Sequence, residues 1–170
     1  DWKAVHTSAD TVSGIVKMQR SKYVQSDPGQ TFSEVKKYLQ SGRNVLFSGT
    51  PCQIYGLKAF LGNCDTQRLY CVDLSCHGVP SPKLLREYLK YQMKEHNSNI
   101  VDFRMRDKRL LKDAYEQGFG IDFENGESYF GNHVEDLYAR CFWGEIASRP
   151  SCYDCTFKTI WRVSDLTLGD

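Results

Sequence analysis

The chain contains no apolar run long enough to cross a membrane, because its longest hydrophobic stretches have only the length of a β-strand. It has no concentration of one charge either, since 22 lysines and arginines stand against 21 aspartates and glutamates along the sequence. Nucleic-acid binders usually carry a basic stripe, so we expect no nucleic-acid partner and no membrane span. Gly-x-Gly-x-x-Gly and Walker loops are also missing, so a nucleotide cofactor would need another kind of site.

The sequence shows no secretion signal, since no charged and then apolar segment opens it. Seven cysteines are an odd number, which disfavours a closed framework of disulfides. Long helical and strand patterns also make such covalent staples unnecessary. We therefore expect a reducing, cytoplasmic location. Because the chain begins at Asp1 and stops directly after a strand-like segment, we further expect a fragment of a longer protein.

The 170 residues suffice for a sizeable core, and we expect residues 1–170 to form a single domain. Short apolar runs predict strands, and apolar residues at every third or fourth position predict the helices between them. Three such strands alternate with two helices, which predicts parallel strands joined by right-handed crossovers. In chain order, the expected strands are 44–48, 69–75 and 100–105, and the expected helices are 51–61 and 82–96.

Flanking elements complete the predicted fold. A short helix is expected around residues 12–16, and another begins at Thr31, whose spacing to Glu34 is typical of a capping box. An Asn-Gly pair predicts a hairpin between strands at 118–123 and 127–130, followed by a helix at 134–146 and a last strand at 165–168. The fold class is therefore α/β: a mixed sheet with a parallel strand–helix–strand–helix–strand core, a β-hairpin and flanking helices.

Four cysteines stand in three short islands of this fold. Cys52 and Cys76 follow the first two predicted strands, and Cys152 and Cys155 form a Cys-x-x-Cys turn near the end of the chain. The carboxyl ends of parallel strands are where open sheets bind ligands. Cys52 also falls in the first turn of a helix, where free N–H groups and the helix dipole stabilise an anionic thiolate. Four thiolates are the ligands of a 4Fe–4S cluster or of a structural zinc ion.

Spacing alone leaves several interpretations of these thiols open. They fit an iron–sulfur cluster, but they fit equally a zinc-stabilised binding or interaction domain. A redox pair made by Cys152 and Cys155, or a structural role without a ligand, is a further possibility. The other three cysteines are expected to be bystanders, with Cys141 on the apolar face of a helix, Cys71 inside a strand and Cys64 in a loop.

Six segments of the chain match a family pattern in the family's own order. They lie at residues 21–26 (SKYVQS), 45–53 (VLFSGTPCQ), 72–81 (VDLSCHGVPS), 103–108 (FxxRDK), 149–155 (RPSCYDC) and 164–170 (SDLTLGD). Together they span nearly the whole chain, and all six in order are far more specific than any one alone. On these segments the chain resembles the coenzyme F420 hydrogenase/dehydrogenase beta-subunit family, C-terminal domain.

The resemblance implies an iron–sulfur flavoprotein oxidoreductase domain that passes electrons between a 4Fe–4S cluster, FAD and a two-electron carrier such as coenzyme F420 or another acceptor. The family's cluster ligands map onto Cys52, Cys76, Cys152 and Cys155, the four that spacing also selects. Its flavin contacts map onto Lys22, Ser26, Ser48, Gly49, Thr50, His77 and Gly78.

The same resemblance implies the partners, which would be a ferredoxin-type electron-transfer domain or subunit and a soluble two-electron carrier. Residues 109–113 stand where many relatives have Gly-Trp, so the acceptor is left open between F420 and another carrier. Hydride transfer to a flavin requires no protein acid or base. The sequence therefore leaves the catalytic residues unassigned.

Overall fold

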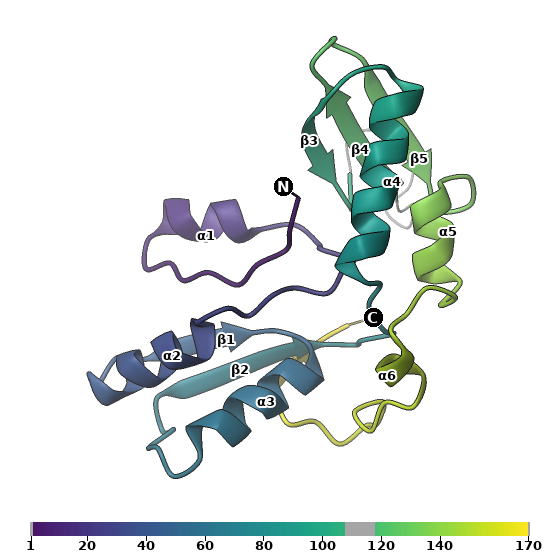
Figure 1. Cartoon of the computed structure of the whole chain (residues 1–170). Helices are drawn as coiled ribbons and strands as arrows, with labels where there is room; N and C mark the ends of the chain where they lie inside the picture. Colours follow the sequence, from purple (N-terminus) through teal and green to yellow (C-terminus); the bar gives the residue numbers. More distant parts are fainter. Residues whose placement is uncertain (1, 108–117, 170) are drawn as a thin grey trace. The chain divides into compact units, whose positions relative to one another are not determined.

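The computed structural model of the chain describes residues 2–107 and 118–169, so Lys108 and the segment 109–113 lie outside the described residues. In chain order (Figure 1), the elements are α1 (Val12–Met18), α2 (Thr31–Gln40), β1 (Val45–Ser48), α3 (Pro51–Leu61), β2 (Leu69–Leu74), α4 (Pro82–Glu95), β3 (Ile100–Arg104), β4 (Gly118–Phe123), β5 (Ser128–Asn132), α5 (Leu137–Trp143), α6 (Pro150–Tyr153) and β6 (Leu166–Leu168). Of the helices in the described part, none combines the length and apolarity that crossing a membrane requires.

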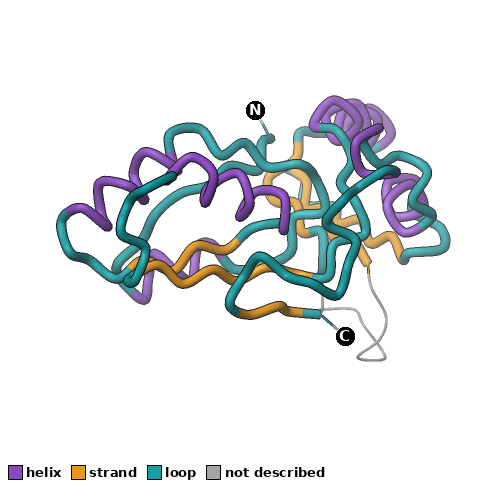
Figure 2. Tube along the Cα trace, turned by 90° about the horizontal axis from the view of Figure 1, so that it is seen from below, coloured by secondary structure: helices purple, strands orange, loops and turns teal. Residues whose placement is uncertain are grey.

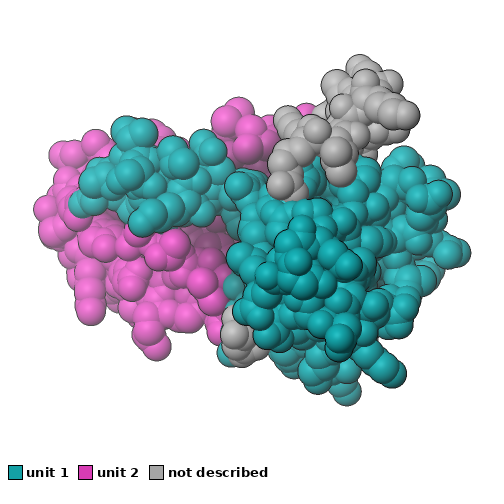
Figure 3. All heavy atoms as spheres, turned by 90° about the horizontal axis from the view of Figure 1, so that it is seen from above, with its two compact units in different colours: residues 1–4, 9–26, 78–150 teal, residues 5–8, 27–77, 151–170 magenta. Residues whose placement is uncertain are grey.

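The elements group into two compact units, which Figure 3 distinguishes by colour. The first unit consists of residues 1–4, 9–26 and 78–150, and the second of residues 5–8, 27–77 and 151–170. All four cysteines predicted to bind a metal belong to the second unit. The single-domain organisation expected from the sequence stays a prediction.

The second unit is built on a parallel sheet with the strand order β1-β2-β6. Figure 2 colours the strands of the chain orange. Leu69 and Cys71 of β2 share one face of the sheet with Phe47 of β1, and this face is buried. Residues of α2 and α3 cover it, forming one core cluster: Val35, Leu39, Phe47, Ile54, Leu57, Leu61, Leu69 and Cys71. On the opposite face, Leu46 and Leu166 are 68% and 57% exposed.

The predicted α/β class with a mixed strand arrangement is confirmed, but the segment predicted as the third parallel strand is the wrong one. Ile100–Arg104 does form a strand, β3, yet it pairs antiparallel with β4 in a separate sheet. The short strand β6 pairs parallel with β2 instead, with Val72 opposite Leu166 and Leu74 opposite Leu168. An apolar run predicts that a strand is buried, but it carries no information about which strand will be its neighbour.

Local signals predict the starts of α2, α3 and α4 correctly, but they assign one cap to the wrong residue. Thr50 precedes α3 with Pro51 as its first residue, and the Thr50 N–H donates to the Gln53 side-chain oxygen at 3.0 Å. Ser81 likewise caps α4 by accepting a hydrogen bond from the Leu84 N–H. The capping box predicted at Thr31 is wrong, because Thr31 is already helical and Gln30 holds the cap position without a side-chain bond.

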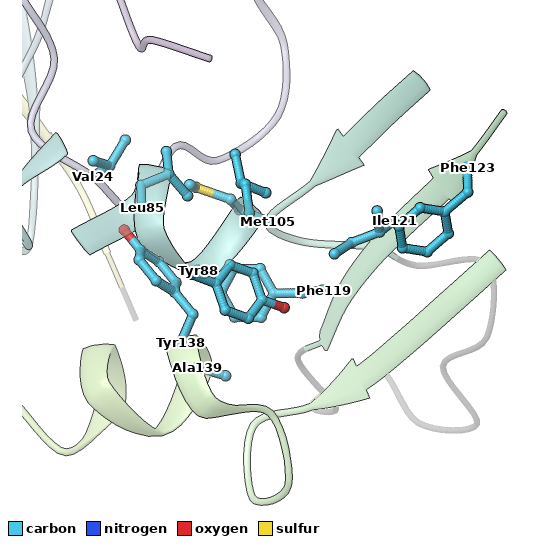
Figure 4. Packing of buried hydrophobic residues seen from close by; sticks show 10 residues of the cluster. Val24, Leu85, Tyr88, Met105, Phe119, Ile121, Phe123, Tyr138 and Ala139 are labelled. Atoms are coloured by element: carbon cyan, nitrogen blue, oxygen red, sulfur yellow. The ribbon is translucent and has the colours of Figure 1, made fainter. Parts of the chain in front are cut away.

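The first unit packs α4 and α5 with an antiparallel sheet of order β3-β4-β5. The predicted hairpin is confirmed, since β4 and β5 pair antiparallel around Gly126. Figure 4 shows the apolar cluster at its centre, which brings Leu85 and Tyr88 of α4 together with Phe119 of β4 and Tyr138 of α5. Phe119, Tyr138 and Ala139 are at most 1% exposed.

Helix α5 is shorter than the predicted helix at 134–146, because Asp136 begins it. The Asp136 carboxylate accepts a hydrogen bond from the Ala139 N–H at 2.7 Å, which is an N-cap interaction. The same side chain is 1% exposed and accepts hydrogen bonds from the Tyr88 hydroxyl at 2.5 Å and the Tyr129 hydroxyl at 3.0 Å. Asp136 therefore ties α4, β5 and α5 together at one buried point.

A second buried polar centre surrounds Arg104 at the end of β3. Its Nε donates to Asp107 at 2.8 Å, and its two terminal nitrogens donate to Asp122 at 2.7 Å and to Asp102. Arg104 and Asp107 are 6% and 2% exposed, so the ion pair between them is shielded from solvent. Gly120 of β4 makes room for this arrangement, because a Cβ atom there would lie 1.9 Å from the Asp107 carboxylate.

Candidate functional site

Cys52 and Cys76 lie where the sequence predicts, at the carboxyl ends of two neighbouring parallel strands. Cys52 is in the first turn of α3, four residues after β1 ends, and Cys76 comes two residues after the end of β2. The Gly49 N–H donates to the Val72 carbonyl at 3.1 Å, which continues the pairing of these strands up to the start of α3. The Thr50 hydroxyl lies 3.1 Å from the Cys52 sulfur.

The Cys-x-x-Cys island is divided between a single helical turn and the loop after it. Cys152 belongs to α6 and Cys155 follows it, with the Lys158 N–H donating to the Cys155 carbonyl. Two contacts join this loop to α3, one at Tyr55, about one turn after Cys52, and one at Lys58, almost two turns after it. The Phe157 ring packs against Tyr55, with centroids 5.2 Å apart, and the Lys58 ammonium donates to the Val163 carbonyl. The loop is therefore anchored on the helix that carries Cys52.

Strand β6 connects the far end of this loop to the segment that carries Cys76. The Ser75 N–H donates to the Leu168 carbonyl at 2.8 Å, one residue before Cys76. Gly169 permits this close approach, since a Cβ atom there would lie 2.7 Å from the Ser75 Cβ. Cys52 and Cys76 thus lie at the carboxyl ends of β1 and β2, and the Cys-x-x-Cys loop is joined to the same unit through α3 and β6.

The structure does not gather the four sulfurs around a common point. Among the described residues, no three His, Cys, Asp or Glu side chains are close enough together to hold a metal ion. Cys52 is exposed, and Cys76, Cys152 and Cys155 are half-buried, so all four can be reached from solvent. The donor set fits a four-thiolate centre chemically, but the coordination itself stays a prediction.

The three cysteines that the sequence analysis expects to be bystanders differ in their surroundings. Cys71 is fully buried in β2, and burial raises the pKa of its thiol, with Lys58 lowering it and Asp165 raising it further. Cys64 packs against the apolar cluster of the second unit and is half-buried. Cys141 is half-buried as well, so the face of α5 that carries it is less covered than the apolar pattern predicts. Of these three, Cys71 is therefore the thiol least accessible to solvent.

The ammonium group of Lys22, a predicted flavin contact, is hydrogen-bonded to backbone carbonyls in this structure. Its ammonium donates to the carbonyls of Gln19 and Arg20, both at 2.7 Å, and to that of Met18, and so closes the end of α1. Desolvation, followed by the neighbouring Arg20 charge, lowers the pKa of Lys22. All three ammonium donors are used, so contact with a flavin phosphate would require some of these bonds to be exchanged.

The other predicted flavin residues are distributed over both units. Ser26 and Gly78 belong to the first unit, as Lys22 does. The turn that links β1 to α3 supplies Ser48, Gly49 and Thr50, and His77 follows Cys76, so these four belong to the second unit. Ser48 and His77 are exposed, whereas Gly78 is buried. Their role in holding a flavin stays a prediction.

Sequence reasoning missed Asp73, the most unusual side chain of the second unit. It lies in β2, is 1% exposed, and has no hydrogen-bond partner for either carboxylate oxygen within the described part of the chain. A buried carboxylate without partners carries a large desolvation cost. Its position beside the predicted flavin-binding turn therefore fits a bound, hydrogen-bonding cofactor. The available signal was a charged residue at an inward position of an otherwise apolar strand.

The fold and the site together define a class: an α/β protein with two cysteines just after the carboxyl ends of neighbouring parallel strands and a Cys-x-x-Cys loop joined to the helix between those strands. A comparison of the sequence with models of known protein families agrees with this class and identifies one family within it. Residues 42–170 match the family model that describes the C terminus of the beta subunit of coenzyme F420 hydrogenase/dehydrogenase. The chain belongs to this family, which consists of oxidoreductase subunits. No curated protein matches the chain.

Proposed function

We propose that the chain is an iron–sulfur flavoprotein domain that passes electrons between a 4Fe–4S cluster, FAD and a two-electron carrier such as coenzyme F420 or another acceptor. When bound, the cluster would supply one-electron chemistry and the flavin two-electron chemistry. The observation that carries the proposal is that Cys52 and Cys76 follow neighbouring parallel strands while the Cys-x-x-Cys loop is attached to α3, the helix that carries Cys52. Family membership supports the same activity.

In this proposal, Cys52, Cys76, Cys152 and Cys155 hold the cluster. The first turn of α3 would favour the negative charge of the Cys52 thiolate through its free N–H groups. The Tyr55–Phe157 contact would keep the Cys-x-x-Cys loop close to α3 and limit the chain entropy lost when the loop binds iron. The half-buried positions of three of the cysteines would restrict access of water to their sulfurs.

The flavin would lie near the turn formed by Ser48, Gly49 and Thr50, with His77 and Gly78 beside Cys76. Lys22 and Ser26 stay flavin contacts that the family resemblance implies. As part of a beta subunit, the chain would act in a complex with other subunits, among them a ferredoxin-type electron-transfer domain or subunit. A soluble two-electron carrier would be its second partner. We propose a cytoplasmic location and one functional domain over residues 1–170.

Single cysteine substitutions test which thiols hold iron. Each of Cys52→Ser, Cys76→Ser, Cys152→Ser and Cys155→Ser is expected to lower the iron content of anaerobically purified protein well below the wild-type value. Cys64→Ser and Cys141→Ser are matched controls, since both cysteines are half-buried like three of the proposed ligands. Full iron retention by any of the first four, or iron loss in a control, would show that the ligand set is a different one.

A further inference from the structure

Asp73 is placed so that its carboxylate faces the interior of the second unit. Leu69, Cys71 and Asp73 alternate along β2 with exposed or half-buried residues, so the three share the face covered by α3. Asp73 is paired in register with Thr167 of β6. On the other side of β2, the Gly49 N–H bonds to the carbonyl of Val72, the residue before Asp73.

The carboxylate of Asp73 is isolated in a way that the other buried acids are not. Asp107 and Asp136 are comparably buried, but the first is paired with Arg104 and the second accepts three hydrogen bonds. Neither oxygen of Asp73 has a partner within residues 2–107 and 118–169. Buried acids are normally paired or hydrogen-bonded. Asp73 therefore has two acceptor atoms that a ligand with hydrogen-bond donors would satisfy.

We propose that Asp73 binds the flavin by accepting hydrogen bonds from hydroxyl groups of its ribityl chain or ribose. This inference rests on the proposed function, since it takes FAD as the cofactor. An ionised carboxylate accepts hydrogen bonds and donates none, so it suits hydroxyl groups and repels the negatively charged phosphates. An acidic side chain near the carboxyl end of a parallel strand is a common partner of ribose hydroxyls. Asp73 likewise lies near the carboxyl end of a parallel strand, β2, and beside the Ser48-Gly49-Thr50 turn.

The first part of the test compares stability and flavin affinity in Asp73→Leu and Asp73→Asn variants. In cofactor-free protein, Asp73→Leu should raise the thermal midpoint, because it removes a buried polar group that has no hydrogen-bond partner among the described residues. The same variant should bind FAD about 10- to 100-fold more weakly, and Asp73→Asn, which keeps one acceptor oxygen, should lose less. Asp165→Asn is the matched control, since Asp165 already accepts a hydrogen bond from the Cys71 N–H. It should lower the thermal midpoint and leave FAD affinity unchanged.

The second part identifies the partner group with flavins of different length. Lumiflavin has the ring but no hydroxylated chain, riboflavin and FMN have the ribityl chain, and FAD adds the ribose. Affinity loss for riboflavin, FMN and FAD but not for lumiflavin assigns the contact to the ribityl chain, and loss for FAD alone assigns it to the ribose. Equal loss for lumiflavin, or unchanged FAD affinity in both variants, would overturn the proposal. Wild-type protein that binds no flavin would instead overturn the proposed function, and the Asp73 proposal with it.

Discussion

The aromatic rings of Tyr55 and Phe157 lie 5.2 Å apart at an interplanar angle of 50°. Tyr55 stands one helical turn after Cys52, and Phe157 stands two residues after Cys155. This contact joins two segments that are about 100 residues apart in the sequence and that both carry proposed cluster ligands. A single aromatic pair therefore links the helix that presents one thiol to the loop that presents two others.

Removing either ring should loosen this link. Tyr55→Ala and Phe157→Ala are expected to speed the release of iron to a chelator, and the double variant should be little worse than either single one. The coupling between the two rings should be about 0.5–1.5 kcal/mol, the usual value for an aromatic pair. Tyr70→Ala is the control, because Tyr70 has a similar exposure, 52%, on a strand without such a contact to the loop. Strictly additive effects would show that the rings do not act together.

Asp136 should be the most sensitive polar residue of the first unit. Replacing it with alanine removes the N-cap of α5 and leaves the hydroxyls of Tyr88 and Tyr129 without their acceptor. We expect Asp136→Ala to lower the free energy of unfolding by about 3–5 kcal/mol. Urea denaturation checks this value. Glu135→Ala, at the exposed neighbouring position, should change stability by less than about 0.5 kcal/mol. A small effect at Asp136 would contradict this hydrogen-bond network.

The phenols bound to Asp136 should make the folded protein sensitive to alkali. Burial, the charge of Asp136 and the hydrogen bond to it raise the pKa of Tyr88 above its ordinary value of 10.0, and the same causes raise the pKa of Tyr129. Above pH 10 the unfolded chain loses these protons while the folded chain keeps them, so stability falls as pH rises. Tyr88→Phe lacks one of the titrating groups.

Urea titrations at several pH values between 8 and 11 measure this dependence. Below pH 10, the difference in the free energy of unfolding between the wild type and Tyr88→Phe should not change with pH. Above pH 10, the free energy of unfolding of the wild type should fall more steeply than that of the variant. Parallel curves for the two proteins would mean that the Tyr88 hydroxyl ionises equally in the folded and unfolded chains. The Tyr91→Phe variant is a suitable control, because Tyr91 lies on the same helix and is 44% exposed.

Gly120 should not tolerate a side chain. A Cβ atom at this position would overlap the Asp107 carboxylate, which is held by Arg104 in the interior. Gly120→Ala is therefore expected to displace Asp107 and cost about 3 kcal/mol or more, since breaking a buried ion pair leaves an uncompensated charge. Gly126→Ala in the exposed hairpin turn is the comparison, with a smaller loss from backbone strain alone. Thermal unfolding of the two variants would separate these effects, and equal losses would contradict the role given to Gly120.

Helix starts and turns were the part of the fold that the sequence predicted best. Thr50-Pro51, Ser81-Pro82 and the Asn-Gly turn before β5 are local signals, because the residues that interact are within a few positions of each other. Strand partners depend on distant residues instead. Arg104 links β3 to β4 through Asp122, and no local pattern around residues 100–105 indicates that pairing.

For the candidate site, too, the sequence predicted the features that depend on local order and missed those that depend on tertiary contacts. The positions of Cys52 and Cys76 at strand ends follow from the alternation of strands and helices, and the structure confirms those positions. The sequence could not predict that the Asp73 carboxylate lacks hydrogen-bond partners among the described residues. That property depends on which groups surround the carboxylate in the folded chain. The anchoring of the Cys-x-x-Cys loop through Phe157 likewise depends on a tertiary contact with Tyr55.

The most direct test of the proposed function is the cofactor content of the protein purified without oxygen. Iron, sulfide, zinc and flavin should be measured together with the visible spectrum before and after reduction with dithionite. The account predicts a brown protein with about four iron atoms and about one FAD per chain, whose visible absorption bleaches on reduction. A colourless protein that contains about one zinc ion per chain and no flavin would contradict it and favour a zinc-stabilised binding domain.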